Sequence, residues 1–231
     1  MIPKVTKLHN YSITYFNKEE LKILDKEIFS DGIYDIELNL ASPVIYDIGS
    51  HIGLSILFFK KKYPKSKIIA FEPNPNVFPL LEENIIQNGL SGVEIHDVGL
   101  GLNEGERILY IDSSDSSAFS TSSFHPNAWN GKQKTLPIKV QVRKLSTYLD
   151  KKCDLLKMDV EGAEFEILEE LVESRKIEFI QNLVFEYHPI NKNRLKKIIK
   201  ILVENHFELE IKEDKNGDEG LIFVVGKKSL K

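Results

Sequence analysis

The chain has 231 residues, of which 42% are hydrophobic, and its formal net charge at pH 7 is −4. This length supports one large domain with a full core, and the small charge and dispersed lysines argue against a nucleic-acid partner. No signal peptide and no run of about 18 apolar residues is apparent, so no membrane association is predicted. With Cys153 as its single cysteine, the chain is expected to be a cytoplasmic protein without disulfides. The sequence leaves its oligomeric state open.

Residues 1–40 are predicted to form an N-terminal helical extension, followed by one domain over residues 41–231. The segment NKEELKILDKEIF begins with Asn17, a favourable N-cap, and repeats Leu21, Leu24 and Ile28 at helical spacing. We expect this helix to pack over the open side of a sheet.

From residue 44 onward, β-branched runs alternate with amphipathic segments, which is typical of a parallel sheet covered by helices on both faces. The predicted strands are 43–48, 67–72, 93–98, 153–159 and 180–187, and the predicted helices are 53–62, 76–88, 163–175 and 191–205. Asn74 and Pro75 are expected to begin the second helix, and Gly89 to end it.

The segments FELEIKE and GLIFVVG are joined through Asn216-Gly217, a strong hairpin signal. The predicted fold is therefore α/β and Rossmann-like, with a doubly wound, mostly parallel sheet that ends in an antiparallel hairpin strand. A dinucleotide-binding domain normally continues with parallel crossovers, so this ending disfavours a dehydrogenase.

A serine-rich stretch at about 112–134 lies between two strand-like segments, RILYID and LPIKVQV. Serine-rich segments are usually solvated loops. This one also contains Phe119, Phe124 and the only tryptophan, Trp129. Long loops in compact domains are often functional, so we predict a lid-like insertion in which Trp129 contacts a substrate.

The run VIYDIGSHIG, residues 44–53, ends in a glycine turn. A dinucleotide fingerprint requires three glycines in the register G-x-G-x-x-G, but Asp47 occupies the first of these places and the later glycines do not fit the spacing. Gly49 would permit a close backbone approach and Gly53 close packing of a helix. An acid at position 47 would repel a pyrophosphate and suits a ligand with an amine.

The next two strands end in polar residues on the same predicted edge. Glu72 lies where a carboxylate can accept both hydroxyls of a ribose, so we expect an adenosine-like ligand. Asn74 could line the base, although a capping role already accounts for it. Asp97 could meet an adenine amino group or simply turn the chain.

The fourth and fifth strands carry charges where central parallel strands are normally apolar. Lys157 and Asp159 share one face of the fourth strand, and Glu186 and His188 share one face at the end of the fifth. Either these residues form a structural ion-pair network or they lie at a reaction centre, and their position at the crevice edge favours the second. We expect the cluster to bind an acceptor and take a proton.

The stretches YDIGSHIG, IIAFEPNP, LLKMDVEGAEFEIL and LVFEYHP together resemble the FkbM family of class I S-adenosylmethionine-dependent methyltransferases, over roughly residues 44–225. The resemblance implies a seven-stranded sheet, S-adenosylmethionine as methyl donor, and O-methylation of a hydroxyl on a small metabolite, sugar or polyketide-like acceptor. The donor residues that it implies are Asp47, Gly49 and Gly53 at the methionine part and Glu72 at the ribose, and Ser50 is predicted to bind the cofactor as well. The acceptor residues that it implies are Asp159, Glu161, Glu186 and His188.

For methyl transfer to an alcohol, His188 or Asp159 could accept the proton and Lys157 could orient the acid. Oxygen and imidazole ligands from this cluster could also hold a divalent cation, but the spacing matches no metal motif and no metal is predicted. The competing hypotheses are a non-catalytic S-adenosylmethionine-binding module and, less favoured, a nicotinamide oxidoreductase.

Overall fold

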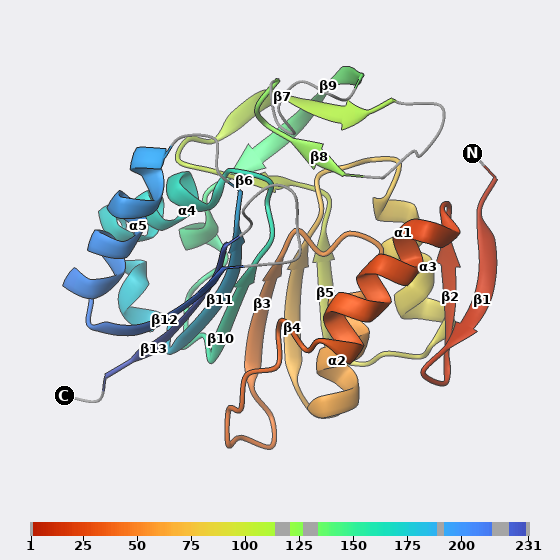
Figure 1. The fold of residues 1–231 in the computed structure, drawn as a ribbon, viewed down its shortest axis with the longest axis horizontal. Coiled ribbons are helices and arrows are strands. Elements are labelled where there is room, and N and C mark those ends of the chain that lie inside the picture. Colours follow the sequence, from red (N-terminus) through yellow and green to blue (C-terminus); the bar gives the residue numbers. More distant parts are fainter. Residues whose placement is uncertain (1, 114–120, 127–133, 189–191, 214–221, 230–231) are drawn as a thin grey trace.

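The computed structural model describes residues 2–113, 121–126, 134–188, 192–213 and 222–229. Its centre is a sheet with helices on both faces, as the alternating sequence pattern predicts (Figure 1). A hairpin from the N-terminus and a second, smaller sheet are added to this arrangement.

The central sheet has the strand order β12-β13-β11-β10-β3-β4-β5. Its strands are β3 (Val44–Ile48), β4 (Lys67–Phe71), β5 (Val93–His96), β10 (Leu155–Met158), β11 (Asn182–Tyr187), β12 (Phe207–Glu213) and β13 (Ile222–Lys228). Neighbours from β11 to β5 pair in parallel, whereas β13 is antiparallel to both β11 and β12. The mostly parallel sheet and its antiparallel hairpin are confirmed, and the Asn216-Gly217 turn falls outside the described residues.

The helices lie close to their predicted positions. They are α2 (Leu54–Lys62), α3 (Phe78–Gln87), α4 (Glu164–Glu173) and α5 (Lys192–Glu204), and short 3-10 turns at Leu145–Thr147 and Lys176–Phe179 precede β10 and β11. Alternation along each strand divides the core in two. Ile45 packs in a cluster with residues of α2 and α3, and Tyr46 in a cluster with residues of α4 and α5.

The start of α3 corrects one prediction. Asn74 and Pro75 do not begin the helix, because the carbonyl of Asn74 accepts a hydrogen bond from the Val77 amide at 3.0 Å and closes a turn first. Val77 is the N-cap, and Pro79 lies in the first helical turn. Gly89 ends the helix as predicted, in a left-handed conformation with φ +59°.

The N-terminal extension is only partly helical, which is a second correction. β1 (Lys4–Leu8) and β2 (Tyr11–Tyr15) form an antiparallel hairpin before α1 (Lys18–Asp25) and a π-helical turn at Lys26–Ser30. The hairpin docks on α3, where Asn84 Oδ1 accepts from the Thr14 amide at 2.7 Å. The turn at His9 and Asn10 has positive φ at both residues, as two-residue hairpins require. The N-cap is confirmed, since Asn17 Oδ1 accepts from the Glu19 amide at 2.9 Å.

A second sheet of order β6-β9-β7-β8 lies between β5 and β10 in the chain. It consists of β6 (Gly99–Leu100), β7 (Gly105–Asp112), β8 (Ser122–Ser123) and β9 (Thr135–Arg143). The two strand-like segments on either side of 112–134 are β7 and β9, which pair as an antiparallel hairpin. Phe119 and Trp129 lie outside the described residues, so the role of Trp129 stays a prediction.

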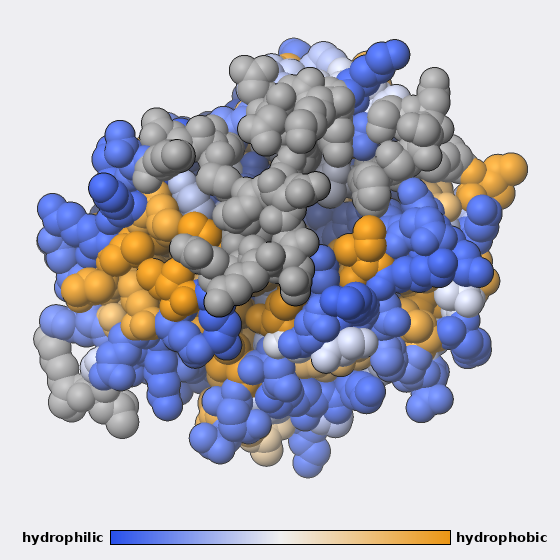
Figure 2. Space-filling view, viewed as in Figure 1, coloured by the Kyte–Doolittle hydropathy of each residue, from blue (hydrophilic) through white to orange (hydrophobic). Residues whose placement is uncertain are grey.

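The surface is largely hydrophilic in the view of Figure 2, with hydrophobic residues gathered mainly on the side where α5 and β12 lie. Among the described residues, no helix is both long enough and apolar enough to span a bilayer. Cys153 is buried and unpaired.

Gly49 provides a test of the glycine turn. It has φ +74°, and a Cβ there would lie 1.7 Å from the Asp159 carbonyl oxygen, whereas Gly89 has φ +59° and open space around it. Gly89→Ala should therefore lower the free energy of unfolding by about 1–2 kcal/mol, the usual cost of a left-handed alanine. Gly49→Ala adds a backbone clash and should cost several-fold more, as measured by urea denaturation. Equal losses in the two variants would contradict this explanation.

Candidate active site

A cavity of about 220 Å³ opens at the carboxyl ends of β3, β4, β10 and β11. β3 and β10 are adjacent, and their following helices lie on opposite faces, so the cavity is at the point where the sheet reverses its winding. The polar residues that line it are Glu20, Glu27, His51, Glu72, Thr121, Ser122, Asp159, Glu161, Glu186 and His188. α1 and the small sheet thus close a crevice that the central sheet forms.

Glu72 lines one end of the cavity and is 5% exposed. Its Oε2 accepts from the His51 amide at 2.9 Å, and its Oε1 accepts from the Asn74 amide at 2.8 Å. Burial raises the pKa of Glu72, while His51 and these backbone bonds act to lower it. Because a carboxylate can accept about four hydrogen bonds, acceptor capacity remains on the side that faces the cavity.

Asp47 and Lys157 form a buried ion pair instead of lining the cavity. They are register partners on β3 and β10, with Lys157 Nζ 3.1 Å from Asp47 Oδ1. Asp47 Oδ2 accepts from Ser55 Oγ at 2.6 Å, and Lys157 Nζ also donates to the Gly49 carbonyl at 2.6 Å. The two residues are 0% and 2% exposed. The pair therefore fixes the glycine turn from beneath.

The other residues predicted to bind the methyl donor differ in whether they line the cavity. Gly49 lines the cavity, whereas Ser50, Gly53, Asn74 and Asp97 are not among the lining residues. Ser50 Oγ donates to the Asp47 carbonyl at 2.8 Å, and a Cβ on Gly53 would lie 2.8 Å from Leu81. Gly53 thus permits the close helix packing that the sequence predicts.

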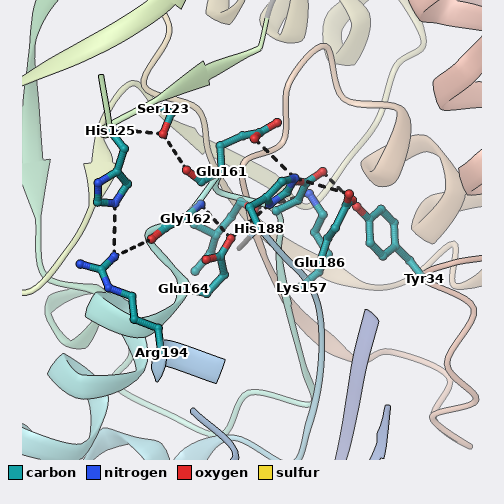
Figure 3. Close-up of polar contacts among 12 residues, drawn as sticks. Tyr34, Ser123, His125, Lys157, Glu161, Gly162, Glu164, Glu186, His188 and Arg194 are labelled. Atoms are coloured by element: carbon teal, nitrogen blue, oxygen red, sulfur yellow. Dashed lines mark hydrogen bonds and ion pairs between the residues drawn. The ribbon is translucent and has the colours of Figure 1, made fainter. Parts of the chain in front are cut away.

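Three carboxylates surround the imidazole of His188 at the other end of the cavity (Figure 3). Nε2 of His188 is 3.4 Å from Glu161 Oε2 and 3.4 Å from Glu186 Oε1, and Nδ1 is 3.4 Å from Glu164 Oε1. Asp159 lies beside this group, and its Oδ2 accepts from the Tyr34 hydroxyl at 3.1 Å. We call Asp159, Glu161, Glu186 and His188 the acidic–histidine cluster.

The electrostatics of the acidic–histidine cluster favour proton retention. Burial alone would lower the pKa of His188, but Glu161 and then Glu164 and Glu186 raise it well above its ordinary value. Burial, with repulsion from Asp159, raises the pKa of Glu161 to about 7, although His188 opposes the shift. Burial and Asp159 also raise the pKa of Glu186. A carboxyl group with a pKa of about 7, as Glu161 has, can exchange protons near neutral pH.

Two neighbours of the cluster were missed from the sequence. Glu164, 1% exposed, accepts from the Gly162 amide at 3.0 Å and faces His188. Its position in the stretch DVEGAE was the available signal. Tyr34 carries no comparable signal, because it comes from the N-terminal segment and meets Asp159 only in the tertiary structure.

The small sheet helps to hold Glu161. Ser123 Oγ donates to the Glu161 carbonyl at 2.6 Å and accepts from the His125 amide at 3.1 Å (Figure 3). Glu161 itself has φ +50°, a left-handed conformation unusual for glutamate. The hydrogen bond from β8 fixes this conformation, so the small sheet affects the site as well as its access.

The buried pair is testable by removing one charge or both. Lys157→Met leaves Asp47 buried without its cation and should lower the free energy of unfolding by about 3–5 kcal/mol. Lys157→Met/Asp47→Asn should recover most of that loss. As a control, Lys22→Met removes an exposed pair with Glu19 and should cost at most about 0.5 kcal/mol. Urea denaturation measures all three, and a double variant no more stable than the single one would contradict the pairing.

The cluster also predicts how stability depends on pH. Glu161 and His188 both have raised pKa values in the folded chain, so both hold protons that the unfolded chain releases. Their contribution is complete below about pH 4.5 and is lost as the pH rises through 7 and beyond. With chelator present, the unfolding free energy of the wild type should therefore fall more steeply between about pH 5 and 9 than that of Glu161→Gln/His188→Gln, by at least about 1 kcal/mol.

The matched control for this measurement is Glu94→Gln/His96→Gln, which removes a partly exposed Glu–His pair separated by 3.1 Å. Its pH profile should follow that of the wild type. Parallel profiles for the wild type and the cluster variant would show that the cluster does not retain the protons.

Comparisons with known proteins identify the family and the fold. Residues 47–209 match the family model of the methyltransferase FkbM domain. "Methyltransferase 1" of Beauveria bassiana (strain ARSEF 2860) is 34% identical over 206 residues, covering 80% of this chain and 82% of that protein. "Methyltransferase sdnD" of Sordaria araneosa is 32% identical over 215 residues, covering 80% and 81%.

Among solved structures, methyltransferase FkbM from Methylobacillus flagellatus KT superposes with a TM-score of 0.57 at 16% identity. The superposition covers 80% of this chain and 44% of that one, so this chain spans less than half of that protein. The solved structure supports the fold, and the family model together with the two fungal relatives supports the family. The chain belongs to the FkbM family of methyltransferases.

Proposed function

We propose that the protein transfers the methyl group of S-adenosylmethionine to a hydroxyl oxygen of a small molecule. The observation that carries the proposal is that one cavity joins the glycine turn and Glu72 at one end to the acidic–histidine cluster at the other. A donor and an acceptor bound at these two ends would meet within the same enclosed space. Holding the reacting atoms in line can supply roughly 7–11 kcal/mol of the barrier reduction.

The donor end fits the nucleoside part of S-adenosylmethionine. Glu72 is held by two backbone amides and keeps acceptor capacity toward the cavity, as recognition of two ribose hydroxyls requires. Ile48, Phe71, Pro73 and Val98 add apolar lining. Asp47 is buried under Lys157, so its part in donor binding is to fix the turn rather than to contact an amine.

The acceptor end can receive a proton. S-adenosylmethionine, when bound, supplies a sulfonium methyl whose transfer to a hydroxyl oxygen leaves the neutral thioether and releases one proton from that hydroxyl. Glu161 and Glu186 line the cavity and have raised pKa values, which suits them to accept this proton near neutral pH. His188 is held as an imidazolium by its carboxylates, so it is suited to orient them rather than to act as the base.

Calorimetry tests the donor site directly. S-adenosylhomocysteine should bind to the wild type, and Glu72→Gln should weaken the affinity about 10-fold or more. The glutamine amide group has an NH2 donor where the carboxylate has an oxygen, so it cannot accept one of the hydrogen bonds from the ribose hydroxyls. Glu83→Gln, on the exposed face of α3, is the control and should bind as the wild type does. Binding of NAD in place of S-adenosylhomocysteine, or no binding of either, would overturn the proposal.

The same preparations distinguish an enzyme from a pure binding module. A panel of hydroxylated small molecules with methyl-labelled donor should yield labelled product with the wild type. Glu161→Gln/Glu186→Gln should lose at least about 100-fold in kcat while retaining S-adenosylhomocysteine affinity, because proton acceptance is lost and the donor end is not touched. Equal turnover in the wild type and this variant would remove the cluster from the mechanism.

A further inference from the structure

We propose that Asp159, Glu161 and His188 bind a divalent cation at the acceptor end of the cavity. The proposal deepens the proposed function and rests on it for the ion's role, but not for the ion's binding. One ligand atom from each residue lies within 4.8 Å of the other two. Around an ion with ligand distances of about 2.1 Å, adjacent ligands are about 3 Å apart and opposite ones about 4.2 Å, so small side-chain rotations complete the site.

The hydrogen-bonding of His188 is a second, independent observation. Its Nδ1 faces Glu164, whose carboxylate is almost fully buried and is itself held by the Gly162 amide. In metal sites, a carboxylate on the far nitrogen of a ligating histidine fixes the ring and raises its basicity. The opposite nitrogen, Nε2, points at the oxygens of Glu161 and Glu186. Without an ion, a proton on Nε2 lies between the ring and these oxygens, and a divalent cation that displaced this proton would bind Nε2 and the carboxylate oxygens together.

The carboxylate of Asp159 is also held by a hydrogen bond from a neighbouring side chain. The Tyr34 hydroxyl donates to its Oδ2, which holds the carboxylate in place and leaves Oδ1 for a ligand. Lys157 is paired with Asp47 beneath the turn, so its ammonium group reaches the cluster only as a charge at longer range. Two carboxylates and one imidazole suit a divalent ion of intermediate hardness, such as Mn²⁺.

The position of the ion indicates the kind of acceptor. Three protein ligands leave open coordination positions, and these face the cavity that the acceptor enters. An acceptor with a hydroxyl beside a second oxygen, such as a vicinal diol or a hydroxy acid, would fill two of them. The ion would stabilise the oxygen that loses its proton, and Glu186, outside the ligand set, would accept that proton.

The test is a Mn²⁺ titration of the chelator-treated full chain, followed by the electron paramagnetic resonance signal of the free ion. The wild type should bind one Mn²⁺ per chain, and His188→Gln and Glu161→Gln should each weaken the affinity at least about 10-fold. Glu94→Gln disrupts a surface Glu–His pair and should bind as the wild type does. S-adenosylhomocysteine affinity, measured in parallel, verifies that each variant has kept its fold and donor end.

No high-affinity Mn²⁺ in the wild type, or equal affinity in the wild type and both cluster variants, would overturn the cation site. These outcomes are independent of the donor test. Mn²⁺ binding without S-adenosylhomocysteine binding would support the cation site and refute the methyl-transfer proposal. S-adenosylhomocysteine binding without Mn²⁺ binding would refute the cation site and would leave the methyl-transfer proposal supported.

Discussion

The buried ion pair between Lys157 and Asp47 is the interaction on which the site depends. It connects the two central strands at the place where the winding of the sheet reverses, and Lys157 extends the connection to the Gly49 carbonyl. The backbone of Gly49 in turn packs against the Asp159 carbonyl more closely than any side chain would allow. Removing a charge here would therefore disturb the cavity on both sides, because the glycine turn and Asp159, the first residue of the acidic–histidine cluster, share one support.

The acidic–histidine cluster shows how a protein can hold several carboxylates close together at a partly buried site. Four acidic side chains lie near one imidazole: Glu161, Glu164 and Glu186 face His188 itself, and Asp159 accepts a hydrogen bond from Tyr34. Burial and repulsion from Asp159 raise the pKa values of Glu161 and Glu186, whereas attraction to the carboxylates raises the pKa of His188 in spite of its burial. A cluster of this kind is stabilised by a cation, whether that cation is a proton or a metal ion.

The elements that cover the cavity are the ones outside the regular alternation of strand and helix. α1 contributes Glu20, Ile23 and Leu24 to the lining, and the π-helical turn after it contributes Glu27. Residues in and beside β8 contribute Thr121, Ser122 and Phe124. The remaining lining comes largely from the carboxyl ends of the central strands. Changes in these covering elements can alter the shape of the cavity while the central sheet stays the same, as loops on a rigid scaffold do.

The sequence by itself determined the alternating core, the order of its parallel strands along the chain, the terminal hairpin and the polar residues at the carboxyl ends of the strands. Periodicity and turn residues encode these features locally, so they could be predicted. The same reasoning placed Glu72, Asp159, Glu186 and His188 at one edge, where the structure brings them to a common cavity. Only the tertiary structure decided that Lys157 neutralises Asp47 below the turn, that Tyr34 holds Asp159, and that β6, β7, β8 and β9 form a second sheet. Those contacts join residues distant in the chain, and their partners are selected by packing rather than by any local pattern.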